Sequence, residues 1–177
     1  MKTKGINHLA LVCRDMAETV EFYTRALDMP LVKTVALPDG GQHFFFDCGG
    51  GVLLAFFWWP DGPPAAPGIA SVKDFPAEPR SAVGSMNHVA FDMDEAELEA
   101  SIGRLQAAGV HVSAPTVVNH DDSPMGVARE MHEGVWVRSV YFRDPNGIML
   151  EFAATLRGFR PGDVAHPPGR ALEAAGA

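Results

Sequence analysis

The sequence predicts an α+β protein made of two tandem modules, each with the element order βαβββ. Three observations support this fold class. A short motif occurs twice, once around position 8 and again around position 88. Each copy leads into a segment with helical periodicity, and each helical segment is followed by three segments with strand character. We therefore expect two modules of the same design within one chain.

The repeated motif forms the first strand of each module. Residues Gly5–Val12 and Ser85–Asp92 both contain Asn-His, then Leu or Val, then Ala. Both segments also alternate in the manner of a strand that is buried on one side. His8 and His88 therefore stand at equivalent positions of equivalent strands.

A helix is expected after each of these strands. Met16–Leu27 has apolar residues at three-to-four spacing, and Asp15 before it is expected to act as the N-cap. Glu95–Ala108 has the same spacing and stops at Gly109, a residue type favoured just after the last helical turn.

Three further strands complete each module. They are expected at Leu31–Leu37, Gln42–Cys48 and Val52–Trp58 in the first module and at Val112–Val118, Val135–Phe142 and Ile148–Ala154 in the second. Turn-forming residues separate them, as in Asp144-Pro-Asn-Gly147 before the last strand. The long connection Asn119–Gly134 interrupts the second module, and loops of this length are often lids or walls of functional sites.

These elements divide the chain into a first module at 1–59, a linker at 60–84, a second module at 85–155 and a C-terminal tail at 156–177. The linker is rich in Pro, Gly and Ala, and neither linker nor tail has a steady periodicity. The linker is long enough for the modules to pair within one chain or to be exchanged between two chains.

Composition and charge exclude several functional classes. The chain has 177 residues, of which 47% are hydrophobic and 20% charged, as in a soluble globular protein. A net charge of −8 argues against nucleic acid or an anionic membrane as partner. The longest apolar run, Val52–Trp59, is too short to cross a bilayer, and no signal peptide is recognisable, so we expect a cytoplasmic protein. Cys13 and Cys48 are expected as small buried hydrophobes rather than a disulfide.

Superimposing the two modules indicates a metal site. In the last strands, Gly51-Val-Leu-Leu-Ala55 matches Gly147-Ile-Met-Leu-Glu151, so Glu151 occupies the place of Ala55. An ionised carboxylate within an apolar strand is costly unless it is paired or binds a metal. His8, His88 and Glu151 form a set of two histidines and one carboxylate that suits Fe(II), although the same donors suit Mn(II), Ni(II), Co(II) or Zn(II).

With these residues the chain resembles the vicinal oxygen chelate superfamily, which includes glyoxalases, bleomycin resistance proteins and extradiol dioxygenases. The resemblance rests on the repeat, the two Asn-His strands and the ending Asp144-Pro-Asn-Gly…Glu151, and it covers residues 5–155. It implies that the modules pair into a cupped, mostly antiparallel sheet around the metal. It also implies a homodimer.

One stretch resembles the signature of type I extradiol ring-cleavage dioxygenases. It runs from His132 through Tyr141 and Asp-Pro-Asn-Gly to Glu151. The resemblance implies that Glu151 is a metal ligand, that Tyr141 contacts a substrate hydroxyl and that His132 lines the site. Gln42-His43 similarly resembles the strand that bears the acid–base histidine. The implied reaction is ring cleavage of a catechol-like small molecule, an aromatic diol, by O2 at Fe(II).

Two alternatives remain open. A glyoxalase-like lyase or isomerase generally has a fourth protein ligand at the end of the first module, where this chain has Ala55. A drug-binding, bleomycin-resistance-like protein would not need His8, His88 and Glu151. The aromatic residues Phe44, Phe46, Phe57, Trp58, Trp59 and Trp136 are expected either in a site wall or in the core. The remaining histidines, His111, His120 and His166, are expected to face solvent.

Overall fold

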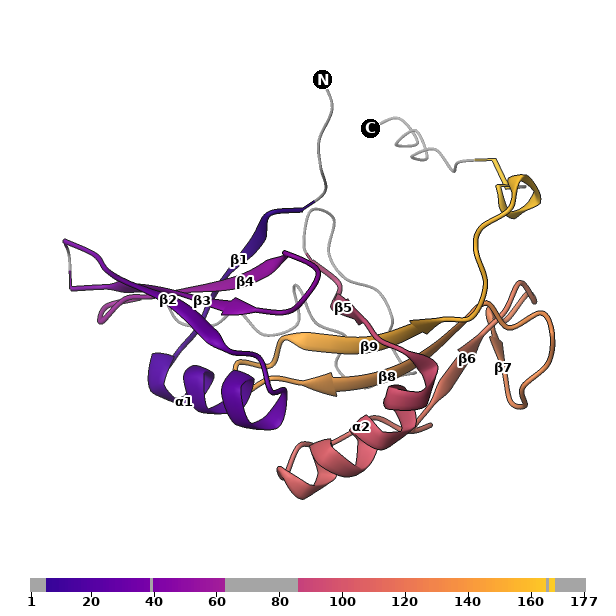
Figure 1. Cartoon of the computed structure of the whole chain (residues 1–177), viewed down its shortest axis with the longest axis horizontal. Helices are drawn as coiled ribbons and strands as arrows, with labels where there is room; N and C mark the ends of the chain where they lie inside the picture. Colours follow the sequence, from indigo (N-terminus) through magenta and orange to yellow (C-terminus); the bar gives the residue numbers. More distant parts are fainter. Residues whose placement is uncertain (1–5, 39, 63–85, 165, 168–177) are drawn as a thin grey trace, which may run out of the picture.

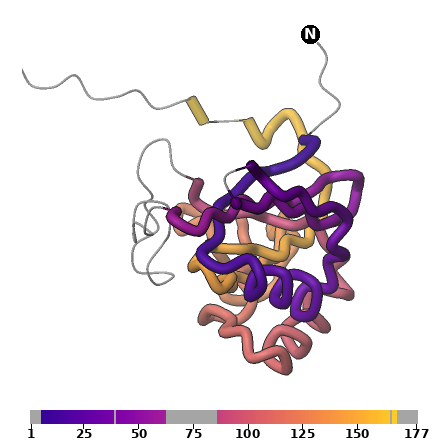
Figure 2. The backbone as a smooth tube through the Cα atoms, turned by 90° about the vertical axis from the view of Figure 1, so that its left-hand side faces the viewer, coloured from indigo at the N-terminus to yellow at the C-terminus, as the bar shows by residue number. Residues whose placement is uncertain are grey.

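The structure is a computed structural model that describes residues 6–38, 40–62, 86–164 and 166–167 of the chain. It contains two separate β-sheets, one for each of the two modules that the sequence predicts. Figure 1 shows the two sheets one above the other, each with its helix on the lower side, and the side view in Figure 2 shows the same succession. The α+β class with tandem βαβββ modules is thereby confirmed.

The first module is a four-stranded sheet with one helix. Its strand order is β1-β4-β3-β2, with β1 parallel to β4 and the other pairs antiparallel. The strands are β1 (His8–Val12), β2 (Leu31–Ala36), β3 (Gln42–Asp47) and β4 (Leu53–Trp58). The helix α1 (Met16–Glu21) continues into a π-helical turn, η1 (Phe22–Ala26). The Asp15 side chain caps α1 by accepting a hydrogen bond from the Glu18 amide at 2.9 Å, as predicted.

The second module is a five-stranded sheet with one helix. Its strand order is β5-β9-β8-β6-β7, with β5 parallel to β9. The strands are β5 (Val89–Asp92), β6 (Val118–His120), β7 (Val127–Ala128), β8 (Val137–Arg143) and β9 (Met149–Thr155). The helix α2 (Glu95–Ala107) ends before Gly109, whose φ of +75° fits the glycine that follows a helix. A 3-10 turn, η2 (Pro161–Asp163), follows the last strand.

The pairing register confirms the alignment of the two modules. In the first sheet Ala10 lies opposite Ala55, and in the second sheet Ala90 lies opposite Glu151. On the next strand, Phe45 pairs with Ala55, and Tyr141 pairs with Glu151. Glu151 therefore occupies the place in the second sheet that Ala55 occupies in the first.

One hydrophobic core joins the modules on the helix side of both sheets. It contains Tyr23, Phe46 and Phe56 from the first module together with Leu98, Phe142 and Leu150 from the second. The turn before β9 docks onto α1, because Asn146 accepts a hydrogen bond from the Arg14 amide at 2.8 Å and Asp144 accepts one from the Tyr23 hydroxyl at 3.3 Å. The opposite face of each sheet, which we call its open face, carries the histidines of the repeated motif.

The predicted strand Val112–Val118 is wrong. Only Val112 forms an isolated bridge, to Phe142, and the continuous strand begins at Val118 and extends to His120. Pro115 lies between them, and a proline has no backbone N–H to donate to a sheet. The expected connection Asn119–Gly134 is correspondingly shorter, and it contains the short strand β7.

No described helix has both the length and the apolar composition that a membrane span requires. Both cysteines are free thiols, with Cys13 buried in the core and Cys48 half-buried. The expected module boundaries and the linker at 60–84 stay predictions, and 63–85 lie outside the described residues.

Candidate functional site

The open face of the second sheet carries a buried carboxylate bonded to a histidine. Glu151 on β9 is 5% exposed, and its Oε2 lies 2.8 Å from Nε2 of His88, just before β5. Its other oxygen, Oε1, accepts a hydrogen bond from the Ser139 hydroxyl on β8 at 2.5 Å. The other ring nitrogen of His88, Nδ1, lies 2.6 Å from the side-chain oxygen of Asn87. The Asn-His motif thus orients the imidazole toward Glu151.

Electrostatics keep this carboxylate ionised although it is buried. Burial raises the pKa of Glu151, but hydrogen bonds from His88 and Ser139 outweigh it and leave the pKa below its ordinary value. His88 remains accessible, since 35% of its side chain is exposed. An ionised carboxylate beside an accessible imidazole provides two of the donors that a divalent metal prefers.

Tyr141 completes this group. Its ring lies edge-on to that of His88, with 5.8 Å between centroids, and its hydroxyl lies 3.2 Å from Nε2 of His120. Burial and the charge of Glu151 raise the pKa of Tyr141, so its hydroxyl stays protonated at neutral pH. The structure therefore brings His88, Glu151, Tyr141 and Ser139 together, and it adds His120 to them.

The open face of the first sheet carries the other predicted histidines. His8 on β1 is exposed, and its ring lies edge-on to Phe45, with 5.8 Å between centroids. The ring of His43 on β3 stacks on that of Phe57, with 3.6 Å between centroids, and Phe57 stacks in turn on Trp59. Two of the aromatic residues expected in a site wall thus lie beside the predicted acid–base histidine, whereas Phe44, Phe46 and Trp58 belong to the core on the other face.

His43 has an unsatisfied ring nitrogen. Its Nε2 is buried and has no hydrogen-bond partner among the described residues. Burial, followed by the proximity of His8, lowers the pKa of His43, so the imidazole is neutral near pH 7. A buried polar atom without a partner is rare and often marks a place where a ligand or ion binds.

A single chain does not gather the full set of predicted metal ligands. Within the described ranges, no three His, Cys, Asp or Glu side chains lie close enough together to hold a metal ion. His88 and Glu151 are in contact on the second sheet, and His8 lies on the first. The set of His8, His88 and Glu151 therefore stays a prediction, with two of its members brought together.

His132 and His120 differ from expectation in opposite ways. The His132 side chain is 48% exposed, and its Nε2 lies 3.2 Å from Asp121 in the loop before β8. His120, expected to face solvent, is instead half-buried at the end of β6 beside Tyr141. The missed signal was the alternation of Val118-Asn-His120, which places His120 on the same face as Val118 if the strand extends past Pro115.

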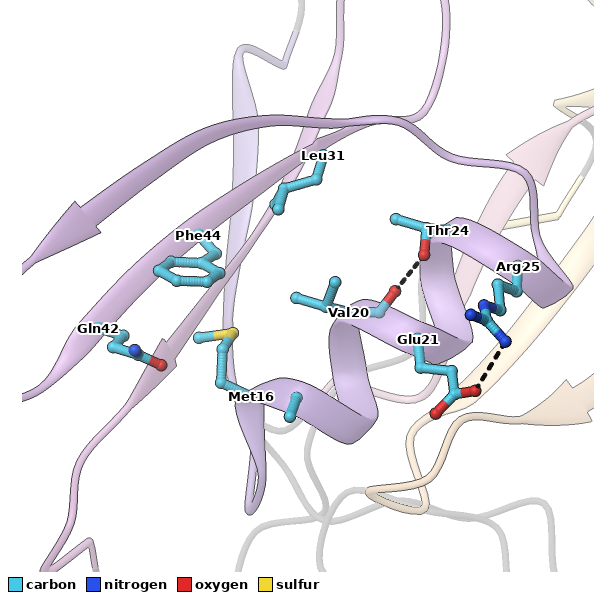
Figure 3. Close-up of a pocket in the computed structure, with 9 residues that line it drawn as sticks. Met16, Val20, Glu21, Thr24, Arg25, Leu31, Gln42 and Phe44 are labelled. Atoms are coloured by element: carbon cyan, nitrogen blue, oxygen red, sulfur yellow. Dashed lines mark hydrogen bonds and ion pairs between the residues drawn. The ribbon is translucent and has the colours of Figure 1, made fainter.

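Two cavities among the described residues lie away from this group. A cavity of about 530 Å³ opens between α1 and the β2–β3 pair, lined by Met16, Val20 and Phe44 among others (Figure 3). A second, of about 1010 Å³, lies between the modules and is lined by Met29, Phe91 and Phe152 among others. Since these residues belong to the helix side of the sheets, the candidate site is an open surface rather than one of these cavities.

Comparisons with known proteins agree with this architecture. Residues 5–152 match the family model of the glyoxalase/bleomycin resistance protein/dioxygenase superfamily. The crystal structure of SMU.1112c is similar, with 27% identity and a TM-score of 0.60 over 86% of this chain and 99% of that one. A glyoxalase family protein from Enterococcus faecalis has 22% identity and a TM-score of 0.58, covering 85% and 97%. The fosfomycin resistance protein FosX from Listeria monocytogenes, solved with Mn(II) and sulfate, has 18% identity and a TM-score of 0.53, covering 88% and 96%.

Proposed function

We propose that this chain, which belongs to the glyoxalase/bleomycin resistance protein/dioxygenase superfamily, is a metal-dependent oxidoreductase of the extradiol dioxygenase type. Its substrates would be a catechol-like small molecule and O2, and its metal Fe(II). The observation that carries this proposal is the group of His88, Glu151 and Tyr141 on one sheet face, with the carboxylate bonded to His88 at 2.8 Å.

The residues of the site fit a divalent metal. His88 offers an exposed imidazole, and Glu151 offers an ionised carboxylate that the fold keeps buried at a cost. Ser139 and Asn87 hold these two ligands from behind, as outer partners commonly do around metal sites. His8, at the equivalent position of the first module, would be the third ligand.

We propose that a second copy of the chain supplies His8. In one chain His8 and the His88–Glu151 pair lie on different sheets, and both histidines are exposed. The strands β1 and β5, which follow the two Asn-His motifs, are both edge strands of their sheets. In this arrangement, the open face of the first sheet in one copy faces the open face of the second sheet in the other copy. Each such pair of sheets would then enclose one complete ligand set. The protein would then be a homodimer with two sites.

The chain's own residues supply the remaining chemistry. A bound metal would lower the pKa of a catechol hydroxyl and hold the diol and O2 side by side. His43, neutral and with a free Nε2, can accept a proton from a substrate hydroxyl and return it. The protonated hydroxyl of Tyr141 can donate to negative charge on a substrate oxygen. Phe57 and Trp59 form a flat apolar wall beside His43 for an aromatic ring.

The residue at position 55 favours a dioxygenase over a four-ligand glyoxalase-like enzyme. A fourth protein ligand would be expected at Ala55, which carries no donor atom and is fully buried between its neighbours. A drug-binding protein without chemistry would not need a buried carboxylate held by two hydrogen bonds. The same donors also accept Mn(II), Ni(II), Co(II) or Zn(II), so the metal must be measured rather than assumed.

An oxygen-consumption assay tests this proposal. Protein reconstituted anaerobically with Fe(II) should consume O2 with at least one member of a panel of substituted catechols and give a ring-opened product. Tyr141→Phe should lower kcat by about 10²-fold, whereas Trp58→Phe, a change on the core side of the same fold, should leave it near its original value. A protein that binds metal but consumes no O2 with any catechol would contradict the dioxygenase proposal and favour a lyase or isomerase.

A further inference from the structure

We propose that His120 is a positioning residue that holds the Tyr141 hydroxyl beside Glu151. This inference rests on the proposed function for its role in the reaction. The hydrogen bond itself can be tested on the metal-free chain. The resemblance to extradiol dioxygenases implies that His132 lines the site. In the structure, it is His120 that lies beside Tyr141.

The contact between His120 and Tyr141 follows from the sheet. His120 ends β6, where it pairs with Val137 of β8, and Tyr141 lies further along β8 on the same open face. Nε2 of His120 lies 3.2 Å from the Tyr141 hydroxyl, and the two rings stand at 81° with 6.3 Å between centroids. Since both residues belong to paired strands, the backbone fixes this contact.

The phenol hydroxyl sets the tautomer that we infer for His120. A tyrosine hydroxyl is protonated at neutral pH, and that of Tyr141 lies 3.2 Å from Nε2 of His120. A neutral imidazole has one ring nitrogen that donates and one that accepts. We therefore expect the proton of His120 on Nδ1, so that Nε2 accepts the hydrogen bond from Tyr141.

The β6–β7 hairpin holds the backbone of His120 in place. Gly126 adopts a φ of +69° in the turn, and its carbonyl accepts a hydrogen bond from the Asp121 amide at 3.3 Å. The next residue, Val127, pairs with His120 across β6 and β7. Most of this hairpin lies in the predicted connection Asn119–Gly134, for which the sequence predicts a lid or a wall of a functional site.

His132 is occupied elsewhere. Its Nε2 lies 3.2 Å from the Asp121 carboxylate, and its Nδ1 accepts a hydrogen bond from the Gly134 amide at 3.0 Å. Both ring nitrogens of His132 therefore have their partners in the exposed loop before β8. With its proton on Nε2, His132 has the opposite tautomer from that inferred for His120, and NMR can tell the two apart.

The consequence concerns the direction of the Tyr141 hydroxyl. A phenol has one proton, and Tyr141 has two nearby acceptors, Glu151 and His120. In the free chain, an acceptor at His120 holds the phenol oxygen in place beside Glu151. When negative charge develops on a bound substrate oxygen, the phenol proton would turn toward that oxygen from a position that His120 has already fixed.

Tyrosine-selective NMR tests the proposal, because the chain has only two tyrosines. With ¹³Cζ-labelled tyrosine, Tyr141→Phe assigns the two resonances, and Tyr23, bonded to Asp144 in the core, is an internal control for folding. We expect His120→Ala to shift the Tyr141 resonance and His120→Gln, which can still accept a hydrogen bond, to shift it less. The matched variant His132→Gln should shift neither. The ring ¹⁵N spectrum should show His120 protonated at Nδ1, with its Nε2 signal moved by Tyr141→Phe.

Two results would overturn the proposal. One is a ring ¹⁵N spectrum in which His120 is protonated at Nε2, or in which its Nε2 signal does not change in Tyr141→Phe. Either result would contradict the hydrogen bond from Tyr141 to His120. The other, with a catechol that the unsubstituted chain oxidises, is an unchanged kcat in His120→Ala, whereas we expect a fall of about ten-fold and partial recovery in His120→Gln. A chain that shows the NMR signatures but binds no metal would contradict the proposed function and leave the hydrogen bond established.

Discussion

At the scale of the residue, the fold keeps a charged group where an uncharged one would fit. Glu151 and Ala55 occupy the same register position, and both are buried. The first module shows that the fold accepts alanine there, so the packing of the strand does not require a carboxylate. The second module instead surrounds Glu151 with His88, Ser139 and Tyr141. This difference between two otherwise similar strands is the residue-scale argument for a functional role.

The hydrogen bond from Ser139 should be worth measurable stability. Ser139→Ala removes the donor to a buried carboxylate, so the free energy of unfolding should fall by about 1–3 kcal/mol. Ser101→Ala is the matched control, because Ser101 is equally buried but donates only to the Leu98 carbonyl within a helix. Urea unfolding of both variants measures the difference. An equal effect for the two serines would contradict a special role for Ser139.

Asp144 predicts a specific dependence of stability on pH. Burial, its largest influence, raises the pKa of Asp144, although hydrogen bonds from Asn146, Ile148 and Tyr23 lower it in part. The folded chain therefore binds this proton more tightly than the unfolded chain, so protonation stabilises the fold. As the pH falls from 7 toward 4, the unsubstituted protein should gain stability relative to Asp144→Asn, whose side-chain oxygen still accepts the two amide hydrogen bonds. If the stability of the unsubstituted protein relative to Asp144→Asn stays constant or falls over this range, the raised pKa is contradicted.

His120 shows what sequence alone could not place. His8, His88 and Glu151 were identifiable because the repeat gave each position a counterpart. His120 has none, and the short alternation of Val118-Asn-His120 stands between Pro115 and Asp121-Asp-Ser-Pro. That alternation indicates only the face of the strand. The contact of His120 with Tyr141 depends on the pairing of β6 with β8, which is a long-range contact.

At the scale of the element, the repeat predicted more than the individual patterns did. Alignment of Gly51-Val-Leu-Leu-Ala55 with Gly147-Ile-Met-Leu-Glu151 gave the correct equivalence of β4 and β9, because the spacing of side chains along a strand fixes the register. Periodicity predicted the bounds of α2 correctly at the first residue and one residue too long at the last. It did not give the change from α-helix to π-helical turn at Phe22, because a single π-helical turn is too short to change the apolar spacing of the whole segment.

The attachment of α2 to its sheet should depend on one arginine. Arg138 on β8 is paired with Glu95 at 2.9 Å and Glu99 at 3.0 Å, and only 13% of its side chain is exposed. Arg138→Met should lower the free energy of unfolding by about 1–2 kcal/mol, since it leaves two glutamates without their partner. Arg104→Met, which breaks the exposed pair with Glu97 at 3.2 Å, is the control and should cost less than about 0.5 kcal/mol. Equal losses in the two variants would contradict this account of the helix attachment.

At the scale of the whole molecule, the proposal depends on two open faces that one chain leaves apart. The first sheet offers His8 and His43, and the second offers His88, Glu151 and Tyr141. The sequence could name these residues but could not say whether they meet within a chain, because the linker permits both arrangements. The structure places the two groups on separate sheets, and we propose that they meet between two chains.

Mixed dimers distinguish the two arrangements. His8→Ala and Glu151→Ala chains, each metal-free alone, should regain about half the metal of the unsubstituted dimer when co-expressed with different tags and isolated as a heterodimer. One of the two sites then combines an intact His8 with an intact His88–Glu151 pair. A site within one chain would stay defective in both partners, so a metal-free heterodimer would contradict the shared site.

The most direct test of the central claim is the metal content of the protein. We would purify the chain anaerobically, reconstitute it with Fe(II), and compare it by elemental analysis with His8→Ala, His88→Ala and Glu151→Ala. The account predicts about one metal ion per chain in the unsubstituted protein and its loss in all three variants. A chain that binds no metal after reconstitution, or that keeps it without Glu151, would contradict the account.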